Sequence, residues 1–173
     1  MVAVTSSGTA VVTLPADTQI KIVREFAASK HFVYKAYTTP ELIKRWWNAK
    51  RGVVTVAEVD LRVGGRWRYV MVTPDGIDVG FHGEFREIVP NQRIVSTEIF
   101  EGIPGMEVPP EQQGDDSAAV NTVTLTEKAG RTTATMLSEY PNQAIRDMVI
   151  QSGMEAGMQD AMDLLEEVAI SLA

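Results

Sequence analysis

Apolar residues recur at every second position through the middle of the chain, and this alternation predicts half-buried β-strands. Short turns separate the strands, among them Gly64-Gly65 and Pro74-Asp75-Gly76, whose residue types suit tight hairpins. Short connections favour antiparallel neighbours. The expected strands are Gln19–Phe26, Val54–Leu61, Arg66–Val72, Asp78–Ile88, Arg93–Phe100, Val120–Thr126 and Thr132–Tyr140.

A helical period appears in two places. After the first strand, Ser29 suits the cap of one short helix, and Thr39 with Pro40 suits the start of a second, which ends near Gly52. From Pro141 onward the pattern predicts one long helix. Its apolar stripe consists of Met154, Met158, Ala161, Leu165, Val168 and Leu172. A lone helix cannot bury this stripe, so the sequence predicts an α+β fold in which an antiparallel sheet of about seven strands curves around the C-terminal helix.

The length of 173 residues suits one domain, which is expected over residues 19–173. Residues 1–18 are expected to form an N-terminal arm or a short extra strand. A long loop is expected over residues 101–118, which contain three Pro, three Gly and five acidic residues but no Lys or Arg. Loops of this length are uncommon and are usually functional lids or disordered excursions, and both interpretations stay open.

Composition excludes several classes of function. The chain has no cysteine, so disulfides, thiolate metal sites and cysteine nucleophiles are absent. A net charge of −7 disfavours binding to nucleic acid and to anionic lipid. No apolar run approaches the ~20 residues that span a bilayer, and no basic leader precedes Lys21. We therefore expect neither membrane insertion nor secretion, and the expected location is the cytoplasm.

One basic cluster surrounds a pair of tryptophans and consists of Lys44, Arg45, Trp46, Trp47, Lys50 and Arg51. Basic residues interleaved with aromatic ones can bind single-stranded nucleic acid, but four cations in an acidic chain are a weak footprint. The simpler interpretation is that the tryptophans pack inward while the charges stay in water. A docking surface for a protein partner is the intermediate interpretation.

Four separate motifs carry a resemblance to a known family. They are TTPELIKRWW (residues 38–47), DLRVGGRWRYVM (60–71), FHGEFREIVPNQRIVSTEIFE (81–101) and RDMVIQSGMEAGMQDAMDLLEEV (146–168). In this order they resemble the activator of heat-shock-protein-90 ATPase homologue family, part of the START-like or SRPBCC superfamily. The resemblance implies the helix-grip fold, with a cavity between sheet and helix, and a ligand-binding or partner-binding role.

The same resemblance bears on partners. Eukaryotic activators of the chaperone pair this kind of domain with a separate N-terminal domain, for which this chain has no room, so chaperone binding is doubtful. The superfamily also contains polyketide cyclases and carriers of lipids and hormones. We therefore expect the partner to be an apolar or amphipathic small molecule.

Residues on the helix-facing side of the sheet are the candidate walls of the cavity. Trp67, Tyr69 and Met71 alternate along one strand and so share a face, and methionine adapts to irregular apolar shapes. The predicted wall residues are Trp67, Tyr69, Met71, Phe81, Phe85, Met136, Gln151, Met154, Met158 and Met162. The alternative is that these residues fill a dry core. The sequence predicts no cofactor, no metal ligand and no catalytic residue.

Two other functions stay open. A cyclase-like or hydrolase-like enzyme could use the same cavity, with acid and base groups among Tyr69, Glu98, Tyr140 and Asp147, although these form no recognisable constellation. An interaction module, such as a homodimer, could use the tryptophan helix and its basic rim. The only two histidines, His31 and His82, are expected at the surface.

Overall fold

The computed structural model describes residues 9–102 and 117–173. Within this part of the chain, eight strands and four helices follow one another. They are β1 (Val11–Thr13), β2 (Gln19–Phe26), α1 (Lys30–Thr38), α2 (Pro40–Trp46), β3 (Val53–Val59), β4 (Arg66–Val72), β5 (Asp78–Val89), β6 (Arg93–Phe100), β7 (Ala119–Lys128), β8 (Arg131–Glu139), α3 (Gln143–Gln151) and α4 (Met154–Ser171). Most of the predicted loop over 101–118 lies outside the described residues.

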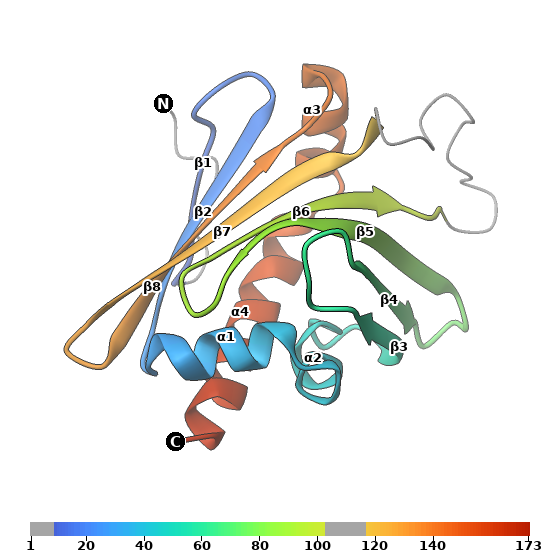
Figure 1. The fold of residues 1–173 in the computed structure, drawn as a ribbon. Helices are drawn as coiled ribbons and strands as arrows, with labels where there is room; N and C mark the ends of the chain where they lie inside the picture. The colour runs from blue at the N-terminus through green and yellow to red at the C-terminus, as the bar shows by residue number, and fades with distance from the viewer. Residues whose placement is uncertain (1–8, 103–116) are drawn as a thin grey trace.

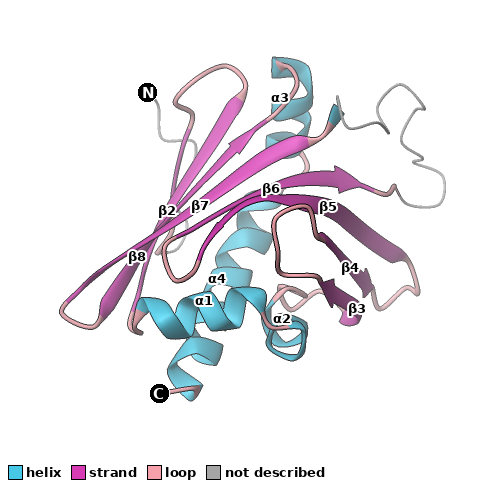
Figure 2. Ribbon diagram, viewed as in Figure 1, coloured by secondary structure: helices cyan, strands magenta, loops and turns pink. Residues whose placement is uncertain are grey.

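The strands form one antiparallel sheet in the order β1-β2-β8-β7-β6-β5-β4-β3. Figure 1 shows the sheet curving around α4, which runs diagonally across one face, while α1 and α2 lie across the lower end of that face. Figure 2 shows that the helices gather on this concave side. The helix-grip fold is therefore confirmed, and the N-terminal part of the chain adds the short edge strand β1.

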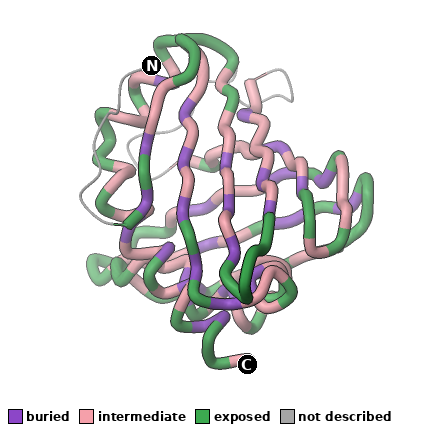
Figure 3. The backbone as a smooth tube through the Cα atoms, turned by 90° about the vertical axis from the view of Figure 1, so that its left-hand side faces the viewer, coloured by how far each residue is buried: buried purple, intermediate pink, exposed green. Residues whose placement is uncertain are grey.

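Buried and exposed residues alternate along the strands, as a sheet with one covered face requires (Figure 3). The core lies between the concave face and the helices. Phe26 and Ile20 on β2 are almost completely buried, as is Leu165 on α4. Helix α1 contributes Val33 to the same cluster. Strand β2, helix α1 and the C-terminal half of α4 thus contribute to a buried core at one end of the concave face.

The prediction of a single C-terminal helix is wrong. The helix breaks between α3 and α4, where Gly153 has a φ of 80°. This left-handed conformation cannot continue an α-helix, and glycine adopts it without the steric cost that a side chain would bring. No proline marks the break, so the sequence pattern predicted one helix across it.

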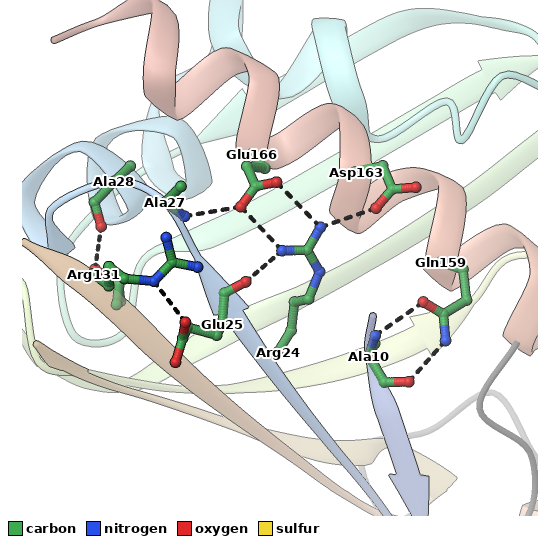
Figure 4. A network of polar contacts seen from close by, with 10 residues as sticks. Ala10, Arg24, Glu25, Ala27, Ala28, Arg131, Gln159, Asp163 and Glu166 are labelled. Carbon is green, nitrogen blue, oxygen red and sulfur yellow. Dashed lines mark hydrogen bonds and ion pairs between the residues drawn. The ribbon is translucent and has the colours of Figure 1, made fainter. Parts of the chain in front are cut away.

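A buried arginine connects the sheet to α4 (Figure 4). Arg24 on β2 is 3% exposed, and its guanidinium forms ion pairs with Asp163 at 2.9 Å and Glu166 at 3.1 Å. The carboxylate of Glu166 also accepts a hydrogen bond from the backbone N–H of Ala27 at 2.8 Å. These contacts hold the C-terminal half of α4 at a fixed position over the sheet.

A second polar contact connects α4 to the start of the chain. The Gln159 side chain accepts a hydrogen bond from the backbone N–H of Ala10 at 3.1 Å and donates one to its carbonyl oxygen at 2.8 Å. Gln159 and Ala10 are both buried, so this pair satisfies two backbone groups that have no access to water (Figure 4).

Candidate functional site

The pairing of the strands determines which side chains share the concave face. Residues directly opposite each other in a ladder point to the same side, as do alternate residues along a strand. Tyr69 lies opposite Phe81, and Phe85 lies opposite Ser96. Ser96 lies opposite Asn121, and Asn121 opposite Ser138. This chain of pairs places six predicted wall residues on one face, namely Trp67, Tyr69, Met71, Phe81, Phe85 and Met136.

An aromatic group occupies the β4–β6 side of this face. The rings of Trp67 and Tyr69 lie 4.7 Å apart, and those of Phe81 and Phe100 lie 5.0 Å apart. Trp47, which follows α2, meets both pairs, with ring centroids 5.6 Å from Tyr69 and 5.8 Å from Phe81. Such edge and tilted arrangements are favourable for aromatic rings. We call Trp47, Trp67, Tyr69, Phe81 and Phe100 the aromatic group.

A hydrogen bond to β6, which passes over Gly83 of β5, positions Trp67. Its indole N–H donates a hydrogen bond to the backbone oxygen of Thr97 at 3.2 Å. Gly83 makes this approach possible, because a Cβ at that position would collide with the same oxygen. Position 83 therefore requires glycine because the backbone of Thr97 lies too close for a side chain, and not because of a special backbone angle.

A row of polar side chains crosses three neighbouring strands of the concave face. On β8, the Ser138 hydroxyl donates to the Asn121 side-chain oxygen at 2.7 Å. On β7, the Asn121 amide donates to the Glu98 carboxylate of β6 at 3.3 Å. Glu98 is two residues before Phe100 on the same strand, so its carboxyl group lies beside the aromatic group. We call Glu98, Asn121 and Ser138 the polar row.

Burial gives Glu98 an unusual titration. Burial raises the pKa of the Glu98 carboxyl to about 7, against the weaker opposing effect of the Asn121 hydrogen bond. Burial, together with the Glu98 charge, raises the pKa of Tyr37 and of Tyr140 to about 12 and also raises that of Tyr69. One carboxyl group therefore changes charge near neutral pH, among phenols that stay neutral.

Accessibility divides the concave face into two ends. The sealed end is buried and contains Phe26, Val33, Leu125, Thr132, Ala134, Leu165 and Val168. The open end points to the same side but keeps partly accessible side chains, at Tyr69, Phe81, Glu98, Phe100, Asn121, Ser138 and Tyr140. These inward-facing side chains stay partly accessible, which makes this end of the concave face the candidate site.

The helices place the other predicted wall residues differently. Met162 is buried in the core, and Met154 and Met158 are partly buried against it. Gln151 is exposed at the end of α3, before the break at Gly153, so the structure does not bring it together with the others. Asp147 pairs with the adjacent Arg146 at 2.7 Å and not with Glu98 or the tyrosines.

The tryptophan helix packs inward. Trp46 is 5% exposed and donates its indole N–H to the backbone oxygen of Ala36 at 2.9 Å. Trp47 is partly buried within the aromatic group. The simpler interpretation of this segment is therefore confirmed: the tryptophans pack inward, while Arg45, Lys50 and Arg51 are exposed to solvent.

The opposite face of the sheet carries a shallow hollow of about 320 Å³, lined by Pro15, Gln19, Lys21, Arg93, Thr122, Thr124, Thr135 and Leu137. It is open to solvent and threonine-rich.

On the same face, His82 and Arg68 both contact Glu101, at 2.9 Å. His31 is exposed. The buried aromatic and acidic groups lie on the other side, so we place the candidate site on the concave face.

The sequence predicted that Trp67, Tyr69 and Phe81 share this face. It did not point to Asn121 or Phe100, and it suggested Glu98 only as a possible catalytic acid or base. The available signal was register: Glu98 occupies a position on β6 that alternates with inward-facing residues, where an acidic side chain is unusual. In the described residues no helix is long and apolar enough to cross a membrane.

Comparison with known proteins identifies relatives by fold and by family model. The family model described as Activator of Hsp90 ATPase homolog 1-like protein matches residues 27–169. No curated protein matches the chain. Among solved structures, the chain is similar to a protein from Rhodobacter sphaeroides, with 24% identity and a TM-score of 0.79 over 92% of this chain and 97% of that one.

Two further structures give the same picture. A protein from Mycobacterium smegmatis has 25% identity and a TM-score of 0.76, over 91% of this chain and 94% of that one. An AHSA1-like protein from Aeromonas hydrophila has 22% identity and a TM-score of 0.61, over 88% of this chain and 93% of that one. Likeness at this level of identity shows the shared fold.

Proposed function

The chain belongs to the family of Activator of Hsp90 ATPase homolog 1-like proteins, and from that premise we propose that it binds an apolar or amphipathic small molecule at the open end of its concave face. The ligand would lie between the sheet and the helices. The aromatic group would contact its apolar part, and the polar row would bind its polar group.

One observation carries this proposal: the polar row and the aromatic group face inward but are not sealed. Trp67 is 6% exposed, whereas Tyr69, Phe81 and Glu98 on the same face keep more accessible surface. A carboxyl group held away from water without a cationic partner destabilises the fold, and such groups mark functional sites more often than chance. A ligand with a polar end would satisfy it.

The chemistry of the two groups fits one amphipathic molecule. Burial of apolar surface contributes about 25 cal/mol per Å², so a medium alkyl chain or ring system packed on the aromatic group supplies most of the affinity. The polar row fixes orientation, because Glu98, Asn121 and Ser138 present both donors and acceptors in a fixed order.

Native mass spectrometry on protein purified from cells tests the proposal, together with thermal unfolding in the presence of alkyl alcohols of increasing length. We expect a retained small molecule, or a ligand that raises the Tm by about 5–10 °C when it is present at about 100 times its Kd. If no mass is retained and no alcohol raises the Tm, the proposal is wrong.

Two matched variants locate the site. Ser96→Phe adds a ring to the concave face beside Phe85 and Asn121, whereas Thr135→Phe adds the same ring to the hollow on the other face. We expect Ser96→Phe to abolish the Tm shift and Thr135→Phe to keep it. The reverse result would move the site to the outer hollow.

A second candidate function is acid–base catalysis, and the titration of Glu98 favours it. A carboxyl group with a pKa of about 7 suits proton transfer at neutral pH. The test is to incubate the retained ligand with wild-type protein and with Glu98→Gln, and to look for a changed mass. Turnover that the variant abolishes would support an enzyme, and an unchanged ligand in both would exclude it.

A further inference from the structure

Glu98 differs from the buried arginines of the protein, because no cation contacts its carboxylate among the residues that the structure describes. Arg24 pairs with Asp163 and Glu166, and Arg146 pairs with Asp147. Among the described residues, the one hydrogen bond of the Glu98 carboxylate comes from the neutral amide of Asn121, at 3.3 Å. Within residues 9–102 and 117–173, the Glu98 carboxyl group therefore lies on the open end without a positive charge beside it.

The surroundings of Glu98 also favour a positive charge. The faces of aromatic rings attract cations, and Trp is the best of them. Trp67 and Tyr69 are paired at 4.7 Å, and Trp47 approaches Tyr69 at 5.6 Å. A carboxylate beside several rings is the combination that recognises ammonium groups.

An anionic ligand does not fit this end of the face. The buried cations are both committed elsewhere, Arg24 to the sealed end and Arg146 to Asp147 and the backbone oxygens of Ala16 and Gln19. Lys21 and Arg93 line the hollow on the opposite face. A carboxylate or phosphate head would meet Glu98 without a positive partner.

We propose that the ligand is a cationic amphiphile, whose ammonium head lies between Glu98 and the aromatic group while its hydrocarbon part lies against the remaining apolar wall. This inference rests on the proposed function, and it narrows the ligand class from any amphipathic molecule to one with a protonated or quaternary amine. The net charge of −7 favours approach of such a ligand from solution.

Isothermal titration calorimetry with three probes of equal chain length tests the proposal. The probes are decyltrimethylammonium, decanol and decanoate at pH 8, with the two ionic probes kept below their micellar concentrations and decanol kept below its solubility in water. We expect the ammonium compound to bind at least about tenfold more tightly than decanol, because its charged head gains a cation–π and charge contact that decanol lacks. Decanoate should bind least tightly of the three.

Glu98→Gln separates this inference from the proposed function, with Glu84→Gln as the matched control because Glu84 is an exposed acid on the neighbouring strand. We expect Glu98→Gln to weaken the ammonium probe about tenfold and to leave decanol within about twofold, while Glu84→Gln changes neither. Decanol binding also reports that the variant is folded.

The outcomes are distinct. If no probe binds the wild-type protein, the proposed function fails. If decanol or decanoate binds as tightly as the ammonium probe, or if Glu98→Gln and Glu84→Gln have the same effect on the ammonium probe, the function stands and the cationic ligand class is wrong.

Discussion

The two ends of the concave face are made by the same sheet, yet they are built differently. At the sealed end, Phe26 and Leu165 pack without accessible surface. At the open end, Tyr69 and Phe81 point to the same side but stay partly accessible. The comparison teaches that one face of a curved sheet can hold both a sealed folding core and a partly accessible surface, which is where we propose that the ligand binds.

The charged groups of the two ends show the same contrast. Arg24 at the sealed end has two carboxylate partners on α4, which offset the cost of removing its charge from water. Glu98 at the open end has a neutral amide partner, and its pKa rises to about 7 as a result of burial. The sealed end favours stability, whereas the open end keeps an unpaired charge that costs stability.

The largest expected effect comes from cutting a large side chain in the sealed core. Leu165→Ala leaves a cavity there and should cost about 2–5 kcal/mol of the free energy of unfolding. Met158→Ala, on the same helix but partly accessible, should cost less than about 1.5 kcal/mol. Urea unfolding measures both. Equal losses would remove the distinction between sealed and partly accessible positions.

Glu98→Gln should stabilise the protein, and its effect should depend on pH. The folded-state pKa of about 7 lies above the ordinary 4.5, so the contribution of the carboxyl to stability is fully present below pH 4.5 and is lost as the pH rises through 7. At pH 8 the variant should therefore gain up to about 3 kcal/mol, and near pH 4.5 almost nothing.

Urea unfolding at pH 4.5 and pH 8 checks this gain, with the exposed Glu84→Gln as control. The control should show no such pH dependence. A variant of Glu98 that is less stable than wild type at pH 8 would mean that its carboxylate is favourably bound rather than strained.

The contact between β1 and α4 gives an intermediate effect. Gln159→Leu keeps the volume but leaves the buried N–H and carbonyl oxygen of Ala10 without partners, which should cost about 1–3 kcal/mol. Gln151→Leu is the exposed control and should change stability little. Thermal unfolding measures both variants. A neutral Gln159→Leu would show that water reaches Ala10, so that this part of the molecule is not sealed.

The smallest effects concern the two glycines where α4 begins. Gly157 lies inside the helix, with the Arg51 guanidinium 3.8 Å from the position of an added methyl, so Gly157→Ala should stabilise by about 0.5–1 kcal/mol. Gly153 has a φ of 80°, so Gly153→Ala should destabilise by about 1–2 kcal/mol. Changes of the same sign, measured by urea unfolding, would show that the helix break is not fixed by Gly153.

Much of the fold could be predicted from the sequence because it depends on local periodicity. The alternation along Arg66–Val72 gave the strand β4 and the shared face of Trp67 and Tyr69. The break at Gly153 was not predicted, since a glycine is also tolerated inside a helix and only the backbone angle shows that this one ends it.

The site was harder to predict than the fold. Its aromatic walls follow from alternation on single strands, but the polar row depends on which residues of β6, β7 and β8 lie opposite one another. That register is a long-range property, and no short segment encodes it. The lack of a cation beside Glu98, among the described residues, likewise depends on side chains that are distant in sequence.

The most direct test of the account is to map ligand contacts residue by residue with amide chemical shifts in ¹⁵N-labelled protein. We expect saturating decyltrimethylammonium to shift the signals of Glu98, Asn121, Ser138 and Tyr140 while those of Phe26, Ala134 and Leu165 stay in place. Shifts confined to the residues that line the outer hollow, or no shifts at all, would contradict a binding surface at the open end of the concave face.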